Sequence, residues 1–564
     1  MKSKVISPLC IYLVPIIILF LSCNDSGNQP PGSVIASSPE ELRVKIEDVI
    51  REELDFAINN KGKIDDSVSL AQPEIVAMVY DKYDHTGIWT NGGTWLPAGD
   101  SLMQFIENSR LYGLFPADYH FATLSSLRGK LVSDTASKLS KMDAVLWSKT
   151  DLLLTDALVQ IINHVKLGRL PADSVTGRKD SLIMSERFIS FVDTLRKSIG
   201  ITNLVQSLEP VHTGYHALKA RLKSFLDSSS DQILTVVPMP GKNAADFKPL
   251  LQRRLFEGGY LPTDSVPADS LQLVNAIKKF QKDNKLTVDG VAGSGTVRML
   301  NLSDKEKFIR IAITLDRYKL LPEKMPFRYI WVNIPSFKME LREADTIKLS
   351  SKIIVGKAQT RTPLLTSAIS ELITYPQWTM PTSIIVKEVL PAAKKDPGYF
   401  ERKGYSLIDS KGEVIDPYTV EWSKYKKGIP YKVVQGSGDD NALGILKFNF
   451  HNKYAVYLHD TNQRYLFARD FRSLSHGCVR VQEWEKLAYT IIRYDNATNP
   501  RTSPMEDSLG SWLKQKVKRS IPIRNRVPVY IRYFGCDATD TGIVFYDDIY
   551  AEDQYLRENY FAGK

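Results

Sequence analysis

The chain has 564 residues, of which 43% are hydrophobic and 24% charged, and a net charge of +10. This is the composition of an ordinary globular protein, and the length predicts about three or four domains. Abundant hydrophobic residues exclude a mainly disordered chain, and only four cysteines in so long a chain exclude a disulfide framework. The mild positive charge suits an anionic surface. No nucleic-acid-binding motif accompanies it, so we expect no nucleic-acid partner.

The N-terminal segment, 1–23, is predicted to be an export signal. A basic start leads into an apolar run that is too short and too interrupted by proline to predict a permanent membrane span. The run ends Phe20-Leu21-Ser22-Cys23, which resembles a bacterial lipoprotein signal and implies a lipid on Cys23 at the mature N-terminus. Cleavage without lipidation is the alternative. Residues 24–37, rich in Asn, Ser, Gly and Pro, are predicted to be a flexible tether.

Residues 38–245 are predicted to be mostly helical. Ser38-Pro39-Glu40-Glu41 supplies an N-cap, a first-turn proline and a glutamate at the capping-box position. The longest candidate helix runs from residue 142 to 166 and stops before Gly168. The histidines of this region are scattered through the sequence, so we expect them to fill ordinary core and surface positions. The region is therefore predicted to be a scaffold without catalytic residues.

Residues 246–302 are predicted to form a compact unit of three helices. Asp269 can cap the second helix, and the turn at Asp289-Gly290 leads into a short third helix. The glycines of that turn are not followed by Gly-Lys-Ser/Thr, which excludes a phosphate-binding loop. A linking helix is expected in the next segment, 303–326.

The hydrophobic period changes from helical to alternating at about residue 327, and a mainly-β domain is predicted over 327–536. The polar, Gly-rich and Lys-rich stretch 391–440 interrupts this domain, and we expect it to be an insertion of the kind that acts as a lid. The acidic and aromatic stretch 537–564 follows the domain, and its sequence predicts no role for it.

A candidate nucleophile and a candidate base lie in the second half of the β domain. Residues 454–458 are predicted to form a strand with His459 at its end, and Ser475-His476-Gly477-Cys478 follows after a charged loop. The next segment, 481–489, is predicted to be a helix. Cys478 would then lie near a helix N-terminus, where the helix dipole favours a thiolate.

These residue types fit acyl transfer through a cysteine. His459 is the predicted base for the thiol proton, and Gly477 allows a tight turn in which backbone amides converge as an oxyanion hole. His476 is expected either to orient the turn or to contact substrate. Two alternatives stay open, a zinc site formed by the two histidines and the cysteine, and a cysteine that is merely buried. Cys536 is predicted to be reduced and structural.

His459, a loop and Ser475-His476-Gly477-Cys478-Val479-Arg480 together resemble the signature of the L,D-transpeptidase catalytic domain family. The resemblance covers most of the chain from about residue 40 and points to the large, multi-domain branch of the family. It implies that His459 is the base, that Cys478 forms a thioester with a donor peptide, and that no metal or organic cofactor takes part. In the family an aromatic side chain lines the substrate groove, and Trp378 is the candidate for that position here. A place in the hydrophobic core is the alternative for Trp378. The residues we assign to substrate binding are Arg480, Tyr457, Trp378 and Ser475.

The predicted fold is a multi-domain α+β chain with a helical scaffold, a three-helix domain and a mainly-β catalytic domain. By the resemblance, 38–245 is the scaffold, 246–302 a peptidoglycan-binding domain, 303–326 a linker helix, 327–536 the catalytic domain and 391–440 its capping insertion. A plain three-helix spacer that binds nothing is the alternative for 246–302.

The resemblance implies an exported enzyme of the cell envelope that cross-links peptidoglycan. Its partners would be a donor tetrapeptide stem, an acceptor amine on a neighbouring stem, and the membrane, through the lipid on Cys23 and facing the periplasm. The expected product is a cross-link between two third-position residues. The alternatives are an L,D-carboxypeptidase, an enzyme that attaches a protein to the wall, and a non-catalytic peptidoglycan-binding lipoprotein.

Overall fold

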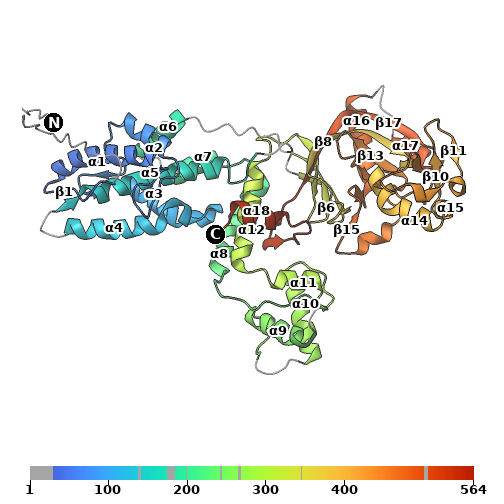
Figure 1. Ribbon diagram of the computed structural model, residues 1–564, viewed down its shortest axis with the longest axis horizontal. Helices are drawn as coiled ribbons and strands as arrows, with labels where there is room; N and C mark the ends of the chain where they lie inside the picture. Colours follow the sequence, from blue (N-terminus) through green and yellow to red (C-terminus); the bar gives the residue numbers. More distant parts are fainter. Residues whose placement is uncertain are drawn as a thin grey trace, which may run out of the picture. The chain divides into compact units, whose positions relative to one another are not determined.

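The chain divides into two compact units in the computed structural model (Figure 1). The predicted signal segment, with Cys23, and residues 24–29 of the predicted tether lie outside the residues that the structure describes. No helix in the described ranges is long and apolar enough to cross a bilayer. The first unit comprises Met1–Met103, Ala117–Gln160 and Ser185–Gly200, and the second comprises Gln104–Pro116, Ile161–Met184 and Ile201–Lys564. The described ranges are 30–136, 141–172, 175, 185–197, 200–241, 244–264, 269–344, 346–500 and 506–564.

Helices dominate the first unit, as predicted for the scaffold. Ser38 caps the first helix as expected, because its hydroxyl accepts a hydrogen bond from the Glu41 amide at 3.1 Å. Strand β1 (Ile35–Ala36) pairs with β4 (Met142–Asp143), and β2 (Thr90–Asn91) pairs with β3 (Thr94–Trp95). The helices that begin in this unit are α1 (Pro39–Asn59), α2 (Pro73–Lys82), α3 (Pro97–Glu107), α4 (Phe121–Ala136), α5 (Ala144–Lys166) and α6 (Ser185–Arg196).

The second unit begins with further helices, three of which form the predicted compact group. Asp269 caps the second of these with a complete capping box, as predicted. The segment predicted to be a linking helix is instead a core helix, α12, with Ile309, Ile311 and Ile313 all buried. A helix that is apolar on several sides needs neighbours all round, which a linker lacks. These helices are α7 (Ile201–Leu208), α8 (Thr213–Ser228), α9 (Ala244–Glu257), α10 (Ser270–Asp283), α11 (Ser294–Leu300) and α12 (Asp304–Lys319).

A nine-stranded sheet forms the predicted β domain, with strand order β15-β7-β16-β14-β13-β8-β17-β5-β6. A further pairing of β6 with β7 closes every strand except β15 into a ring. Alternate side chains point inward, and α16 (Trp484–Thr498) and α17 (Glu506–Lys514) add apolar residues to the same core. The strands are β5 (Arg328–Asn333), β6 (Lys338–Glu343), β7 (Thr346–Gly356), β8 (Leu365–Thr374), β13 (Leu446–Phe450), β14 (Leu458–His459), β15 (Ser473–Ser475), β16 (Val479–Val481) and β17 (Arg519–Arg532).

The insertion in this domain is a small subdomain with its own core rather than a loop. Its sheet has the order β11-β10-β12-β9, and Phe400 stacks on the buried Trp422 with ring centroids 5.3 Å apart. Because β9 pairs with β12, the subdomain starts at Trp378, earlier than the predicted boundary. Its elements are β9 (Trp378–Thr379), α13 (Thr382–Ile384), the π-helical η3 (Ile385–Val389), α14 (Leu390–Lys395), α15 (Tyr399–Lys403), β10 (Tyr405–Ile408), β11 (Val414–Ile415) and β12 (Lys432–Gln435).

The C-terminal stretch, 537–564, packs against the helices of the second unit. Strand β18 (Cys536–Thr539) pairs with β19 (Gly542–Phe545), and α18 (Glu552–Tyr560), in red, lies beside α12 in Figure 1. A buried ion pair between Arg317 and Asp553 joins these two helices. Cys536 is a free, buried thiol, as predicted. The stretch therefore belongs to the core of the second unit.

Candidate active site

The fold brings the two predicted catalytic segments together. Strands β14 and β16 pair in parallel, with Leu458 opposite Val479 and His459 opposite Arg480. Leu458 and Val479 are both buried in the barrel core. Since successive side chains of a strand point to opposite faces, His459 and Arg480 project from the outer face, and Cys478, which precedes Val479, lies on that side too.

The expected helix dipole is absent from Cys478. Strand β16 follows the cysteine directly, and the helix starts only at Trp484. The strand predicted upstream is also shorter than expected, since only Leu458 and His459 pair in β14. Burial raises the pKa of the Cys478 thiol instead of lowering it. Any stabilisation of a thiolate must therefore come from side chains and amides around the sulfur.

Three residues supply that stabilisation. The Cys478 sulfur donates to the Ala455 carbonyl at 3.9 Å, and the backbone and side chain of Tyr457 together with the positive charges of Lys447 and Arg480 lower the pKa of the thiol. The Lys447 ammonium lies 3.9 Å from the centre of the Tyr457 ring, a cation–π contact. Burial lowers the pKa of Lys447, and its residual charge remains next to the thiol. These groups oppose, but do not overcome, the effect of burial on the thiol pKa.

His459 is fully enclosed and held by the backbone. Its Nδ1 contacts the carbonyl oxygen of Asp460, and its ring meets Tyr457 edge-on at 5.7 Å. The Asp460 carboxylate is itself fixed by Arg464 through hydrogen bonds of 3.0 and 2.6 Å. Burial, followed by the charge of Arg480, lowers the pKa of His459 to about 3. The imidazole is therefore neutral at physiological pH.

The turn that carries the nucleophile is closed by Ser475. The Ser475 hydroxyl donates to the Cys478 carbonyl at 2.6 Å and accepts from the Gly477 amide at 3.1 Å. Gly477 has φ +123, a conformation that other residues rarely adopt. The Gly477 amide, expected to converge with its neighbours on an oxyanion, is thus already engaged inside the turn.

A chain of hydrogen bonds braces the turn from the C-terminal stretch. Thr362 donates through its hydroxyl to the Gly477 carbonyl at 2.8 Å, and its amide donates to the Tyr550 hydroxyl at 3.1 Å. Tyr550 in turn donates to the Gly356 carbonyl at 2.6 Å, at the end of β7. The position of the catalytic turn therefore depends on a residue far beyond it in the sequence.

The rim of the site joins the turn to the capping subdomain. The exposed His476 pairs with Glu388 of η3, and Trp378 of β9 hydrogen-bonds Tyr457. Arg480 donates to Gln463 at 3.0 Å, while its buried Nε has no hydrogen-bond partner among the described residues. Trp378 thus lies beside Tyr457 and also packs against the core of the capping subdomain, and its place in a substrate groove stays a prediction. Within the same residues no group of three or more His, Cys, Asp or Glu side chains is placed to hold a metal ion.

Sequence reasoning missed Lys447, Glu388, Thr362 and Tyr550. Lys447 had a local signal, because it alternates with the apolar Leu446 and Phe448 and so faces the outer side of its strand. For Thr362 and Tyr550 no sequence signal existed, since their contacts are set by the tertiary fold. The motif identified the chemistry, and the fold supplied the residues around it.

Comparison with known families supports the predicted organisation. Three family models match the chain: the L,D-transpeptidase catalytic domain over 327–501, a scaffold domain over 74–222, and a "putative peptidoglycan binding domain" over 249–300. A curated protein of Haemophilus influenzae (strain ATCC 51907 / DSM 11121 / KW20 / Rd), named "Putative L,D-transpeptidase", is 33% identical over 287 residues. The match covers 50% of this chain and 56% of that protein, so the chain spans little more than half of the relative's length.

Two solved structures also align with the chain. The Ldtfm–avibactam carbamoyl enzyme has a TM-score of 0.18 at 12% identity and covers 39% of this chain and 61% of its own. The L,D-transpeptidase (Yku) from Stackebrandtia nassauensis has a TM-score of 0.17 at 12% identity and covers 54% of this chain and 96% of its own. Superpositions with such scores carry no argument about the fold.

A cysteine on a glycine turn and a buried histidine on the adjacent strand of a mainly-β domain are the residue types that a cysteine acyltransferase uses. The family follows from the matched models. Residues 327–501 match the model of the L,D-transpeptidase catalytic domain, and the scaffold and peptidoglycan-binding models match the segments before it, in the order that the sequence predicts.

Proposed function

We propose that this protein is a peptidoglycan L,D-transpeptidase that links two third-position residues through a thioester on Cys478. The observation that carries the proposal is the parallel pairing of β14 with β16, which sets His459 and Cys478 on one outer face of the matched catalytic domain. The substrate class follows from the family.

The reaction has two balanced steps. The Cys478 sulfur attacks the carbonyl carbon of the third stem residue, the C–N bond to the terminal D-residue breaks, and the thiol proton passes through His459 to the departing amine. An acceptor amine then attacks the thioester carbonyl and the C–S bond breaks. The proton lost by that amine returns through His459 to the sulfur.

The resting pair holds its proton on sulfur. The raised pKa of Cys478 and the pKa of His459 near 3 mean that a thiolate–imidazolium pair is unfavourable before substrate arrives. Proton transfer therefore accompanies attack on the carbonyl. A bound peptide that displaces water and aligns the thiol would promote that step.

Four further residues take assigned roles in this mechanism. We assign the oxyanion contacts to the Cys478 amide and the Tyr457 hydroxyl, because the Gly477 amide is engaged by Ser475. The unpartnered Nε of Arg480 is available for a carbonyl or carboxylate of the stem peptide. Trp378 supplies an apolar wall, while Ser475 and His476 act by holding the turn and its contact with the capping subdomain.

The proposed location is the cell envelope, with the domains on the periplasmic side and a lipid on Cys23. Metabolic labelling with palmitate tests the anchor, and a Cys23→Ala chain should remain unlabelled. An L,D-carboxypeptidase and a wall-protein attachment enzyme share the thioester step and differ only in the acceptor.

The deciding experiment is intact-protein mass after incubation with a carbapenem, for the wild type and the Cys478→Ala variant. One adduct on the wild type and none on the variant supports the acyl-enzyme. An adduct on the variant, or none on either well-folded protein, refutes it. Mass spectrometry of products from tetrapeptide-containing peptidoglycan fragments then separates the enzymes: dimers mean transpeptidation, and free tripeptides alone mean hydrolysis.

A further inference from the structure

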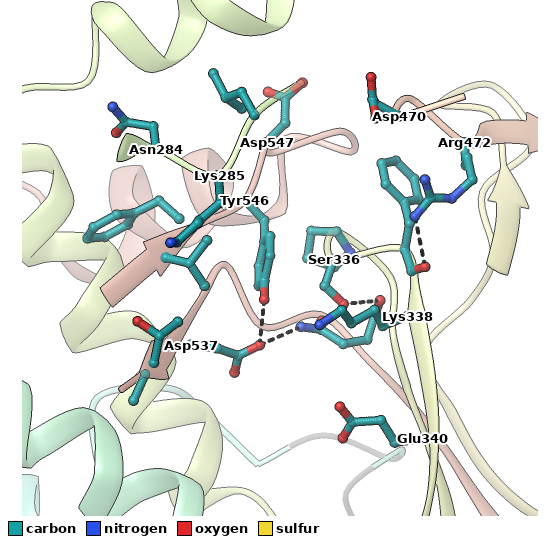
Figure 2. Close-up of a pocket in the computed structure, with 18 of the residues that line it drawn as sticks. Asn284, Lys285, Ser336, Lys338, Glu340, Asp470, Arg472, Asp537, Tyr546 and Asp547 are labelled. Carbon is teal, nitrogen blue, oxygen red and sulfur yellow. Dashed lines mark hydrogen bonds between the residues drawn. The ribbon is translucent and has the colours of Figure 1, made fainter. Parts of the chain in front are cut away.

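A large cavity in the second unit lies apart from the catalytic turn (Figure 2). Its volume is about 1040 Å³, at the upper limit of pockets that enclose a single small molecule. One wall comes from the segment 284–298 of the peptidoglycan-binding match, and another from the outer face of β5 and β6. The hairpin of β18 and β19 closes the space between them. Its lining includes none of the residues assigned to catalysis.

Two lysines that form no ion pair among the described residues face this cavity from opposite walls, and the charge of Lys338 also acts on Asp537. Figure 2 shows Lys285 on one side and Lys338 on the other, and both ammonium groups lack an ion pair within the described ranges. The other cations are engaged: Arg298 pairs with Asp547, and Arg342 pairs with Glu340. Two like charges that converge on one space favour an anion between them.

Hydrogen-bonding and apolar groups complete the lining. Asp537 accepts a hydrogen bond from the Tyr546 hydroxyl at 3.0 Å and lies 3.5 Å from the Asn333 amide, in the middle of the view in Figure 2. At the edge, Phe471 is 50% exposed and Ile347 equally so. A ligand that matches this lining has carboxylates for the lysines, amides or hydroxyls for the polar centre, and an apolar portion for the edge.

Burial of Asp537 fits the same interpretation. Burial raises the pKa of its carboxyl to about 6, so near neutral pH the group changes readily between hydrogen-bond donor and acceptor. The remaining carboxylate at the edge, Asp470, lies close to the charge of Arg472. The charge of Lys338 opposes the effect of burial on the Asp537 carboxyl.

We propose that this cavity is a second peptidoglycan-binding site, built jointly by the peptidoglycan-binding domain, the β5–β6 face of the catalytic barrel and the C-terminal hairpin. Its ligand is a saccharide segment with an attached acidic peptide, whose carboxylates meet Lys285 and Lys338. The identity of the ligand rests on the proposed function, since only a wall enzyme would meet this polymer. Such a site holds a strand of the wall while Cys478 works on another part of it, and so raises the local concentration of stems.

The test is co-sedimentation of the full-length chain with purified peptidoglycan sacculi. The double variant Lys285→Glu/Lys338→Glu is compared with Lys282→Glu/Lys514→Glu, which makes the same charge change on exposed lysines of the same two domains outside the cavity. We expect the cavity variant to bind about tenfold more weakly or worse, and the control to bind like the wild type. Thermal unfolding verifies that both are folded; since neither cavity lysine forms an ion pair, both should be.

Wild-type affinity in the cavity variant would overturn the proposal, and so would a wild type that does not sediment. A second probe is sacculi from which the stem peptides have been removed by an amidase. Equal binding to this bare glycan would overturn the acidic-peptide assignment. Carbapenem acylation of the wild type, measured on the same preparations, tests the proposed function separately. If sedimentation depends on the two lysines but no acylation occurs, the proposed binding site stands and the proposed enzymatic function is refuted.

Discussion

Two buried polar clusters in this chain differ in how completely their groups are satisfied. In the first unit, the Asp151 carboxylate of α5 accepts hydrogen bonds from the Tyr80 and Thr90 hydroxyls, both at 2.6 Å, and from the Ile88 amide at 2.7 Å. In the second unit, the buried Nε of Arg480 has no partner among the residues described, and the thiol beside it has a raised pKa. A buried cluster in which every hydrogen-bonding group has a partner stabilises the fold. A cluster with an unpaired hydrogen-bonding group near the protein surface can instead offer that group to a ligand.

The largest expected effect is on catalysis, at His459. The change His459→Gln should lower the rate of cross-link formation by about 10²- to 10⁴-fold, because the thiol loses its proton acceptor. Product formation from tetrapeptide fragments measures the rate. The exposed His451 offers the matched control, His451→Gln, which should leave it unchanged. A His459→Gln protein with wild-type activity would show that another group takes the proton.

Removing the satisfied carboxylate should instead cost stability. Asp151→Ala leaves several buried donors without an acceptor and should lower the free energy of unfolding by about 3 to 5 kcal/mol. Chemical denaturation measures the loss, and Asp66→Ala, at an exposed position of the same unit, is the control. Carbapenem acylation of the still-folded protein should be unaffected. Loss of acylation there would mean that the two clusters are coupled.

The pH dependence of Cys478 alkylation tests whether the thiol of the incompletely paired cluster is protonated at rest. Because burial raises the pKa of Cys478, the sulfur stays protonated through neutral pH. Its reaction with iodoacetamide should therefore accelerate by about tenfold per pH unit up to pH ~9, since only the thiolate reacts. A plateau near neutral pH would indicate a resting ion pair with His459. The Cys478→Ala variant corrects for other reactive groups.

The smallest effect is expected in the brace behind the turn. Tyr550→Phe removes the hydroxyl between Thr362 and Gly356 and should cost about 1 kcal/mol of stability, with carbapenem acylation about fivefold slower. Tyr555→Phe is the matched control, because Tyr555 is 56% exposed on α18. Acylation at the wild-type rate in a destabilised Tyr550→Phe protein would limit the hydroxyl to a structural role.

The segments that meet at the candidate site could be predicted from the sequence, because residue type and local pattern coincide there, while the roles of their residues stay predictions. His459, Gly477 and Cys478 are adjacent to patterned strands and a turn residue, so their roles could be inferred before their positions were known. The helix expected from residue 481 starts only at Trp484, because Val479–Val481 is too short for its period to distinguish a strand from the first turn of a helix.

What could not be predicted depends on contacts between distant segments. The capping subdomain has a polar composition, yet Trp422 and Phe400 come together to make its core. Likewise, Arg317 forms its ion pair with Asp553, and local periodicity cannot predict a contact between residues so far apart in the sequence. Local pattern therefore identified the elements, while their partners and the surroundings of the thiol required the fold.

The hydrogen bond from Tyr550 to Gly356 has a consequence for biosynthesis. A ribosome makes the scaffold, the three-helix domain and most of the barrel, Cys478 included, before it reaches residue 550, and domains fold in the order in which they emerge. The brace behind the nucleophile cannot form until this late segment has been made and delivered. A nascent chain would thus carry Cys478 in an unsupported turn until Tyr550 had emerged from the ribosome.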